Sequence, residues 1–198
     1  MLLAFTSISQ VKVGLKFGVN GTDLIEDSSN EPAFQIAFSP KISLGGGFFA
    51  QFNLNEKVDL LTEITYTNKG AFDENGDNVS LNLLYLNASV LAKYNVYKNL
   101  SILLGPEFGY KLFAVSRSDD RGVDVSNLWE KDLDLGIITG LSFEVSERIM
   151  IDLRYVHGFL NVFTDGIFDT DDGNNRREIT TNYRNHMLQF NLFYAIFK

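Results

Sequence analysis

Apolar and polar residues alternate with a period of two along residues 81–114. From residue 84 to residue 94 the even positions are all apolar and the odd ones mostly polar: Leu84, Leu86, Ala88, Val90, Ala92 and Tyr94 form the apolar row. After a short turn at 96–99 the alternation resumes, with one face made of Leu100, Ile102, Leu104, Phe108, Tyr110 and Leu112. A period of two is that of a β-strand with one apolar and one polar face. The pattern predicts two neighbouring antiparallel strands.

The same alternation recurs in six further segments, which are residues 11–19, 42–54, 58–69, 133–145, 149–159 and 186–197. These segments are long, since roughly 9–11 residues of a tilted strand cross a bilayer and about 5–6 residues are typical of a globular sheet. The apolar faces would then contact lipid and the polar faces would line an interior. The pattern predicts an all-β fold, an eight-stranded antiparallel up-and-down transmembrane β-barrel.

The connections between these strands alternate in length. Long polar segments follow the first, third, fifth and seventh strands, at residues 20–40, 70–78, 115–131 and 160–183. Short turns follow the second, fourth and sixth strands. Such barrels keep short turns in the periplasm and long loops outside the cell. Pro106 falls inside the fifth strand, where it cannot donate a ladder hydrogen bond, and a β-bulge is expected there.

Aromatic residues are frequent on the outward faces, many of them near strand ends, as belts at the two membrane interfaces require. They are Phe48, Phe52, Tyr66, Tyr94, Phe108, Tyr110, Phe143, Tyr155, Phe190 and Tyr194.

The chain has 198 residues, a length that favours one domain. It has no cysteine, which excludes disulfides and a cysteine-bound zinc. Its net charge of −8 disfavours nucleic acid and anionic lipid surfaces as partners, and most of its 25 acidic residues fall in the long connections. Residues 1–10 look like the end of a signal peptide cleaved near Ser9 or Gln10, which leaves 11–198 as the barrel domain; a disordered or strand-extending N-terminus is the alternative.

The inward faces carry six basic and six acidic residues. They are Lys12, Lys16, Lys69, Lys93, Lys111 and Arg154 on one side, and Asp59, Glu63, Glu107, Asp134, Glu144 and Asp152 on the other. The interior of an eight-stranded barrel is barely wide enough for its own side chains, so opposite charges are expected to pair there. We expect a salt-bridged, closed lumen; a narrow or gated ion path is the alternative. Lys93→Ala or Glu107→Ala should then lower stability, or raise conductance if the network is a gate.

Candidate catalytic and metal-binding residues are few. His157 and His186 could meet at the outer rim, but no GxSxG motif supplies a nucleophile, and interfacial histidines are the simpler interpretation. Asp169, Asp171, Asp172 and Gly173 resemble part of a calcium loop without the spacing and closing Glu of an EF-hand. We therefore expect no enzyme activity, no cofactor and no metal.

Several short motifs resemble the PorT-like outer-membrane β-barrel family of Bacteroidetes, barrels of the OmpA/OmpX type. They are Lys69-Gly70, Ala92-Lys93-Tyr94, Gly105-Pro106 through Gly109-Tyr110, and Arg154-Tyr155. The resemblance implies an eight-stranded barrel, a cleaved signal peptide and an outer-membrane location in a Gram-negative bacterium, and brings no catalytic residues. Lys198 after Phe197 departs from the terminal aromatic residue that the insertion machinery often recognises.

The sequence thus favours a non-enzymatic integral outer-membrane barrel with a structural or interaction role. Its expected partners are outer-membrane lipid, the insertion machinery and an extracellular partner at the loops, and it is expected to be a monomer. A porin-like channel for ions or small solutes is the first alternative. A soluble lipocalin-like ligand-binding barrel is the second, and would need an apolar interior.

Overall fold

The computed structural model describes residues 11–28, 38–73, 79–118, 121–124, 132–171 and 175–198. The expected signal-peptide segment, residues 1–10, lies outside the described residues. Eight long strands make up the molecule: β1 (Val11–Ser28), β3 (Lys41–Asn53), β4 (Val58–Lys69), β6 (Val79–Tyr97), β7 (Leu100–Ser118), β9 (Leu133–Glu144), β10 (Ile149–Asp171) and β11 (Asn175–Phe197). Three short strands, β2 (Phe38–Ser39), β5 (Phe72–Asp73) and β8 (Arg121–Asp124), lie beside them.

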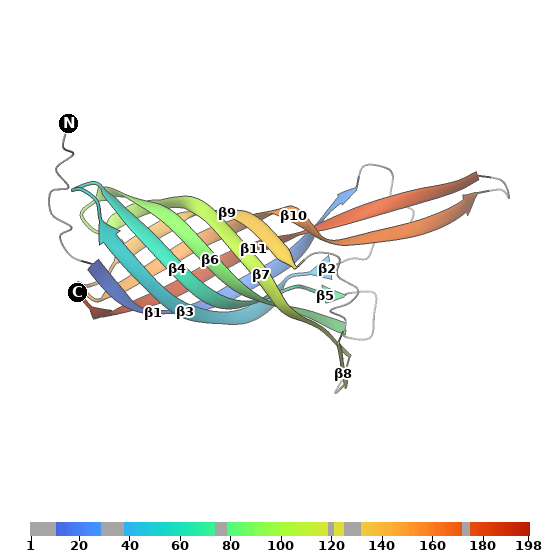
Figure 1. The fold of residues 1–198 in the computed structure, drawn as a ribbon, viewed down its shortest axis with the longest axis horizontal. Helices are drawn as coiled ribbons and strands as arrows, with labels where there is room; N and C mark the ends of the chain where they lie inside the picture. Colours follow the sequence, from blue (N-terminus) through green and yellow to red (C-terminus); the bar gives the residue numbers. More distant parts are fainter. Residues whose placement is uncertain (1–10, 29–37, 74–78, 119–120, 125–131, 172–174) are drawn as a thin grey trace.

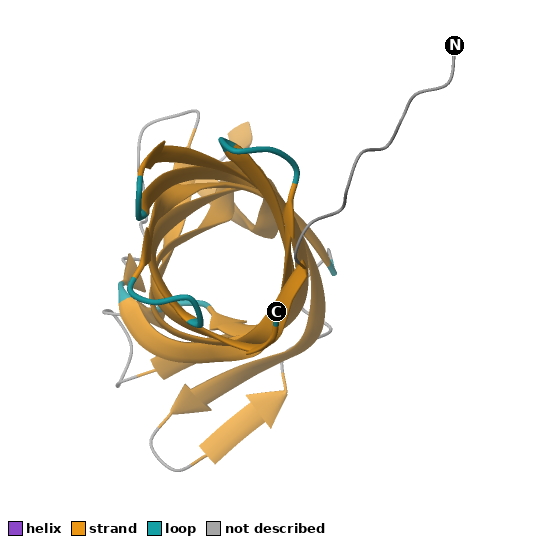
Figure 2. Ribbon diagram, turned by 90° about the vertical axis from the view of Figure 1, so that its left-hand side faces the viewer, coloured by secondary structure: helices purple, strands orange, loops and turns teal. Residues whose placement is uncertain are grey.

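The eight long strands close into a ring. The order β6-β4-β3-β1-β11-β10-β9-β7 is completed by the pairing of β6 with β7, and every pairing is antiparallel. Figure 2 views this ring along its axis. The first and last strands form one long seam, from Val13 opposite Phe197 to Ser28 opposite Thr181. The predicted fold, an eight-stranded antiparallel barrel, is confirmed.

Short turns join β3 to β4, β6 to β7 and β9 to β10 at one end of the barrel, which we call the turn end; the opposite end is the loop end (Figure 1). Side chains fix two of these turns. Asn55 Oδ1 accepts hydrogen bonds from the backbone N–H groups of Lys57 and Val58, and Ser146 Oγ accepts from that of Ile149. Polar turn residues of this kind hold the chain in a tight reversal.

At the loop end, the expected long loops are partly strand. β1 continues to Ser28, and β10 and β11 continue as a paired hairpin to Asp171 opposite Asn175, far beyond the barrel (Figure 1). The interpretation of residues 20–28, 160–171 and 175–183 as loop was therefore wrong. Backbone pairing needs no apolar face, and where both faces of a ribbon meet water the period-two signal disappears from the sequence.

Pro106 does not produce the expected bulge. The pairs Ser89–Glu107 and Ala92–Leu104 on either side of it keep one register, and Pro106 itself lies opposite Ile137 of β9. The shift in β7 falls instead at Leu112, so that Phe113 is exposed and Ala114 buried. The ladder accommodates one missing N–H without changing which side chains face the lumen.

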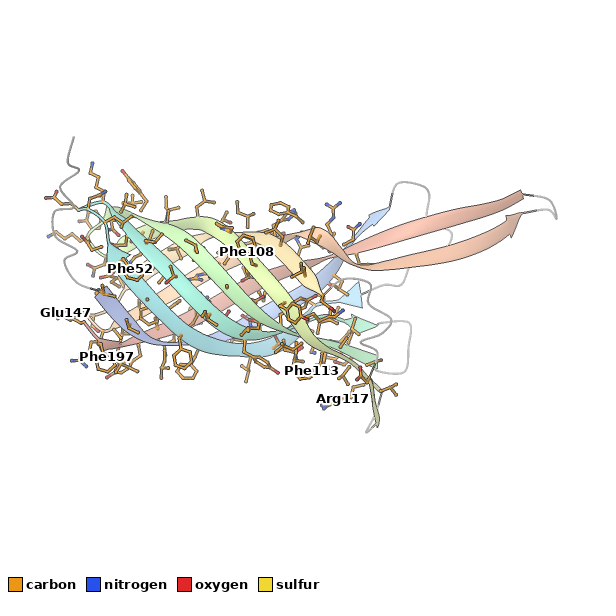
Figure 3. The ribbon with its side chains drawn as sticks, viewed as in Figure 1. Phe52, Phe108, Phe113, Arg117, Glu147 and Phe197 are labelled. Atoms are coloured by element: carbon orange, nitrogen blue, oxygen red, sulfur yellow. The ribbon has the colours of Figure 1, made fainter. Side chains whose placement is uncertain are left out.

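The outer wall is apolar. The outward rows of Leu, Ile, Val, Phe and Tyr predicted from the alternation are exposed or half-buried. Nine of the ten predicted belt aromatics are exposed, and Phe52 is half-buried. In Figure 3, Phe52 and Phe197 lie toward the turn end and Phe113 toward the loop end. Exposed apolar surface this extensive is unstable in water and stable in lipid. Within the described ranges, no helix has the length and apolar character needed to cross a membrane.

Candidate functional site: the charged lumen

The lumen holds all twelve charged residues predicted to face inward. Ten of them are buried, whereas Lys12 and Glu144, at the turn end, keep side chains that are 22% and 30% exposed. Each of the twelve makes at least one ion pair, and the pairs fall into three groups along the barrel axis.

The central cluster consists of Lys16, Glu63, Asp152 and Arg154, from β1, β4 and β10. Arg154 donates to both carboxylate oxygens of Glu63, at 2.7 and 3.0 Å, and reaches Asp152 Oδ2 at 2.5 Å. Lys16 Nζ lies 2.8 Å from Glu63 Oε2. Two cations thus meet two carboxylates with almost no solvent exposure, a bidentate geometry that offsets much of the desolvation cost.

Space for Arg154 depends on a glycine in the neighbouring strand. Gly140 of β9 lies directly opposite Arg154. A Cβ atom built on Gly140 would lie 2.9 Å from Arg154 Cγ and 2.6 Å from the Leu153 carbonyl oxygen. The missing side chain at 140 therefore gives the arginine room to cross the lumen.

The loop-end cluster is built around Lys69 at the end of β4. Its ammonium group lies 3.1 Å from Glu107 Oε1 and 2.8 Å from Asp134 Oδ2, and Asn185 donates to the same Asp134 oxygen at 2.9 Å. Lys111 pairs with exposed Asp132 at 3.2 Å, a partner outside the predicted set.

The turn-end cluster is centred on Lys93, which is fully buried. Lys93 Nζ lies 2.5 Å from Glu144 Oε1 and 3.9 Å from Asp59 Oδ2. Glu144 also faces Lys12 at 3.6 Å. Solvent reaches this cluster through Glu144 and Lys12.

Apolar side chains separate and cap these clusters, and the sequence analysis assigned them no role. One group surrounds the central cluster and its border with the turn end: Phe49, Leu61, Leu91, Leu103, Ile138, Met150, Val156, Met187, Phe193 and Ala195. Arg154 and Lys16 lie over the Phe193 ring, at 5.2 and 5.6 Å from its centroid, within cation–π range. Adjacent apolar pairs such as Phe48-Phe49 and Leu60-Leu61 break the alternation, and these pairs are the sequence feature that could have indicated inward-facing apolar residues.

A second apolar group closes the loop end above Lys69: Leu24, Ala71, Leu83, Tyr85, Ala114 and Tyr183. Lys69 Nζ lies 4.9 Å from the centroid of the Tyr85 ring. Five apolar side chains have zero exposure to solvent: Leu61, Leu83, Leu91, Leu103 and Phe193. Side chains thus fill the lumen at two levels.

The two histidines meet on the outer wall. His157 and His186 are register partners across β10 and β11, with ring centroids 4.5 Å apart, and the Tyr155 hydroxyl hydrogen-bonds to His186 Nδ1. Among the residues whose side chains are described, no group of three His, Cys, Asp or Glu could hold a metal ion. The side chains of the acidic run at Asp169, Asp171 and Asp172 lie outside that set.

A closed eight-stranded barrel with an apolar exterior and a charged interior is an integral outer-membrane β-barrel. The chain belongs to the family described as "Outer membrane protein beta-barrel domain", whose model matches residues 6–164. This membership and the apolar outer wall exclude the soluble lipocalin-like alternative. None of the curated protein sequences matches the chain.

Solved structures share the fold. Neisserial surface protein A is 13% identical with a TM-score of 0.57, and the match covers 95% of this chain and 100% of that one. Ail, the attachment invasion locus protein of Yersinia pestis, is 14% identical with a TM-score of 0.50, covering 94% and 99%. Ail has also been solved in complex with the heparin analogue sucrose octasulfate. At these identities the likeness is one of fold.

Proposed function

We propose that this chain is a non-enzymatic outer-membrane barrel whose salt-bridged lumen is closed, and whose role is structural or interactive through its loop end. It acts as a monomer, is inserted by the outer-membrane insertion machinery, and belongs to the PorT-like subgroup. Residues 1–10 are the end of a cleaved signal peptide.

The filled lumen is the observation that carries this proposal. Paired charges occupy three levels, and the apolar side chains between and above them are buried. An ion crossing this interior would have to part buried ion pairs that have little water to replace them. A barrel packed in this way favours rigidity over transport.

A gated channel is the second candidate. Side chains alone fill the lumen, and the turn-end cluster already opens to solvent through Glu144 and Lys12. A rearrangement of Lys93 and its apolar neighbours would extend that opening inward. The same charges would then select the permeant ion.

An extracellular partner at the loop end would be basic or neutral. The heparin analogue bound to Ail is a polyanion. Here most of the 25 acidic residues lie in the long connections, where like charge would repel such a ligand.

Single-channel conductance of the refolded protein in a planar bilayer tests the proposal. A shift between boiled and unboiled samples on a gel first confirms that the barrel has formed. We expect no discrete conductance steps from the folded protein. Regular steps that change in size with Lys93→Ala would overturn the closed barrel in favour of the channel.

A further inference from the structure

A cavity of about 590 Å³ lies inside the turn end of the barrel. Its volume is within the roughly 300–1,000 Å³ range of small-molecule sites. Lys93 and Leu103, a fully buried register pair, come two residues further from the turn than the lining pair Asn95 and Ser101 and separate the cavity from the centre of the barrel. We propose that this cavity, the turn-end vestibule, binds a neutral polyhydroxylated solute of the size of a mono- or disaccharide from the periplasmic side.

One wall of the vestibule offers fixed hydrogen-bond acceptors. Asp59, which is 3% exposed, accepts from Gln51 Nε2 at 3.0 Å and from Asn53 Nδ2 at 2.9 Å. Each bond orients its amide and uses one of the two N–H donors, so each side chain keeps its carbonyl oxygen as an acceptor, beside one further donor, for the cavity it lines. Gln51 is itself buried, and its orientation is set before any solute arrives.

A second wall, from β6 and β7, offers donors. The Ser101 hydroxyl donates to Asn95 Oδ1 at 2.7 Å, which orients the Asn95 amide so that its nitrogen serves as the donor toward the cavity. Ser101 is 2% exposed and Asn95 half-buried. Donors and acceptors thus stand on adjoining walls, as the hydroxyls of a sugar, each both donor and acceptor, require.

The charge balance of the vestibule disfavours a charged solute. The carboxylates of Asp59 and Glu144 already face Lys93, and Glu144 also faces Lys12. Glu56 and Lys98, one of each sign, complete the charged lining. An ion would have to compete with these pairs, whereas a neutral solute can use the amides and hydroxyls without breaking them, with the Tyr97 ring as an apolar surface.

Maltose titrated into the full chain tests this assignment. The protein is refolded in a phosphocholine detergent, which carries no sugar, and the side-chain amide signals of Gln51, Asn53 and Asn95 are followed by NMR. We expect saturable shifts confined to the vestibule. Asn95→Ala should weaken binding about tenfold, the loss that follows from one or two hydrogen bonds.

Asn87→Ala is the matched control. Asn87 is a buried lumen amide that donates to Thr67 and does not line the vestibule, so its loss should leave maltose binding unchanged. Absence of saturable shifts in protein that passes the gel-shift test would overturn the proposal. Equal effects of the two variants would also overturn it, and so would tighter binding of glutamate or putrescine than of maltose.

Discussion

The central and turn-end clusters use the same chemistry in different surroundings. In the central cluster, Glu63 and Arg154 are almost fully buried and meet in a bidentate pair. In the turn-end cluster, Glu144 is 30% exposed and its contact with Lys12 is 3.6 Å long. Both clusters join lysine or arginine to two carboxylates, and the apolar side chains of Leu61, Leu103 and Phe193 lie near the boundary between them.

The comparison shows that burial decides what an ion pair contributes. Removing one member of a buried group leaves a charge without compensation, whereas water solvates the remaining partner of an exposed pair. The central cluster therefore serves to hold the barrel wall together from inside. The turn-end cluster is the part that can exchange protein contacts for water or a solute.

The largest expected effect is that of Arg154→Met. Asp152 loses the guanidinium group with which it pairs, and Glu63 keeps its pair with Lys16, so the free energy of unfolding should fall by about 3–5 kcal/mol. Urea unfolding in lipid vesicles, followed by the gel shift, measures this. Adding Asp152→Asn should restore part of the loss. Unfolding of Arg154→Met at the wild-type urea concentration would contradict the account.

A smaller loss is expected from Leu103→Ala, which removes part of the apolar boundary between the clusters. Leu103 has zero exposure, and truncating a buried leucine costs about 2–5 kcal/mol, with about 3 expected here. Leu104→Ala, next in sequence but 51% exposed on the lipid side, is the control and should cost less in the same urea titration. Equal losses would mean that the interior apolar group is not packed as described.

The smallest effect is expected from Lys12→Ala at the turn end. Its pair with Glu144 is partly exposed, and such pairs contribute about 0–1 kcal/mol. The loss should shrink further in 1 M salt, where exposed charges are screened. If Lys12→Ala lowered the free energy of unfolding more than Leu103→Ala does, and salt did not change this loss, the two clusters would not differ in the way described.

The alternation in the sequence predicted most of the barrel. It predicted the eight strands and the three short turns. It also predicted that side chains such as those of Glu63 and Arg154 face inward, because alternate side chains of a strand point to opposite faces, one apolar and one polar. It did not predict which charges meet. Lys16 and Arg154 both reach Glu63 across the lumen, and these contacts depend on the stagger of the strands, which parity does not contain.

Two other features escaped prediction for physical reasons. Phe49, Leu61, Leu91 and Leu103 face inward although they are apolar, and a rule that assigns apolar residues to lipid passes over them. The sequence of the extension of β10 and β11 beyond the barrel carries no alternation, and backbone pairing does not require one.

The seam between β1 and β11 has a consequence for assembly. Because the first strand of the ring pairs with the last, a chain in which β1 and β11 have not yet paired has two open strand edges and no closed ring. Closure requires contacts between the two ends of the chain, and topologies with such distant contacts fold slowly. Until the ring closes, the open edges can pair with other chains. The unpaired edges of β1 and β11 are the surfaces that an escort protein would shield between synthesis and insertion.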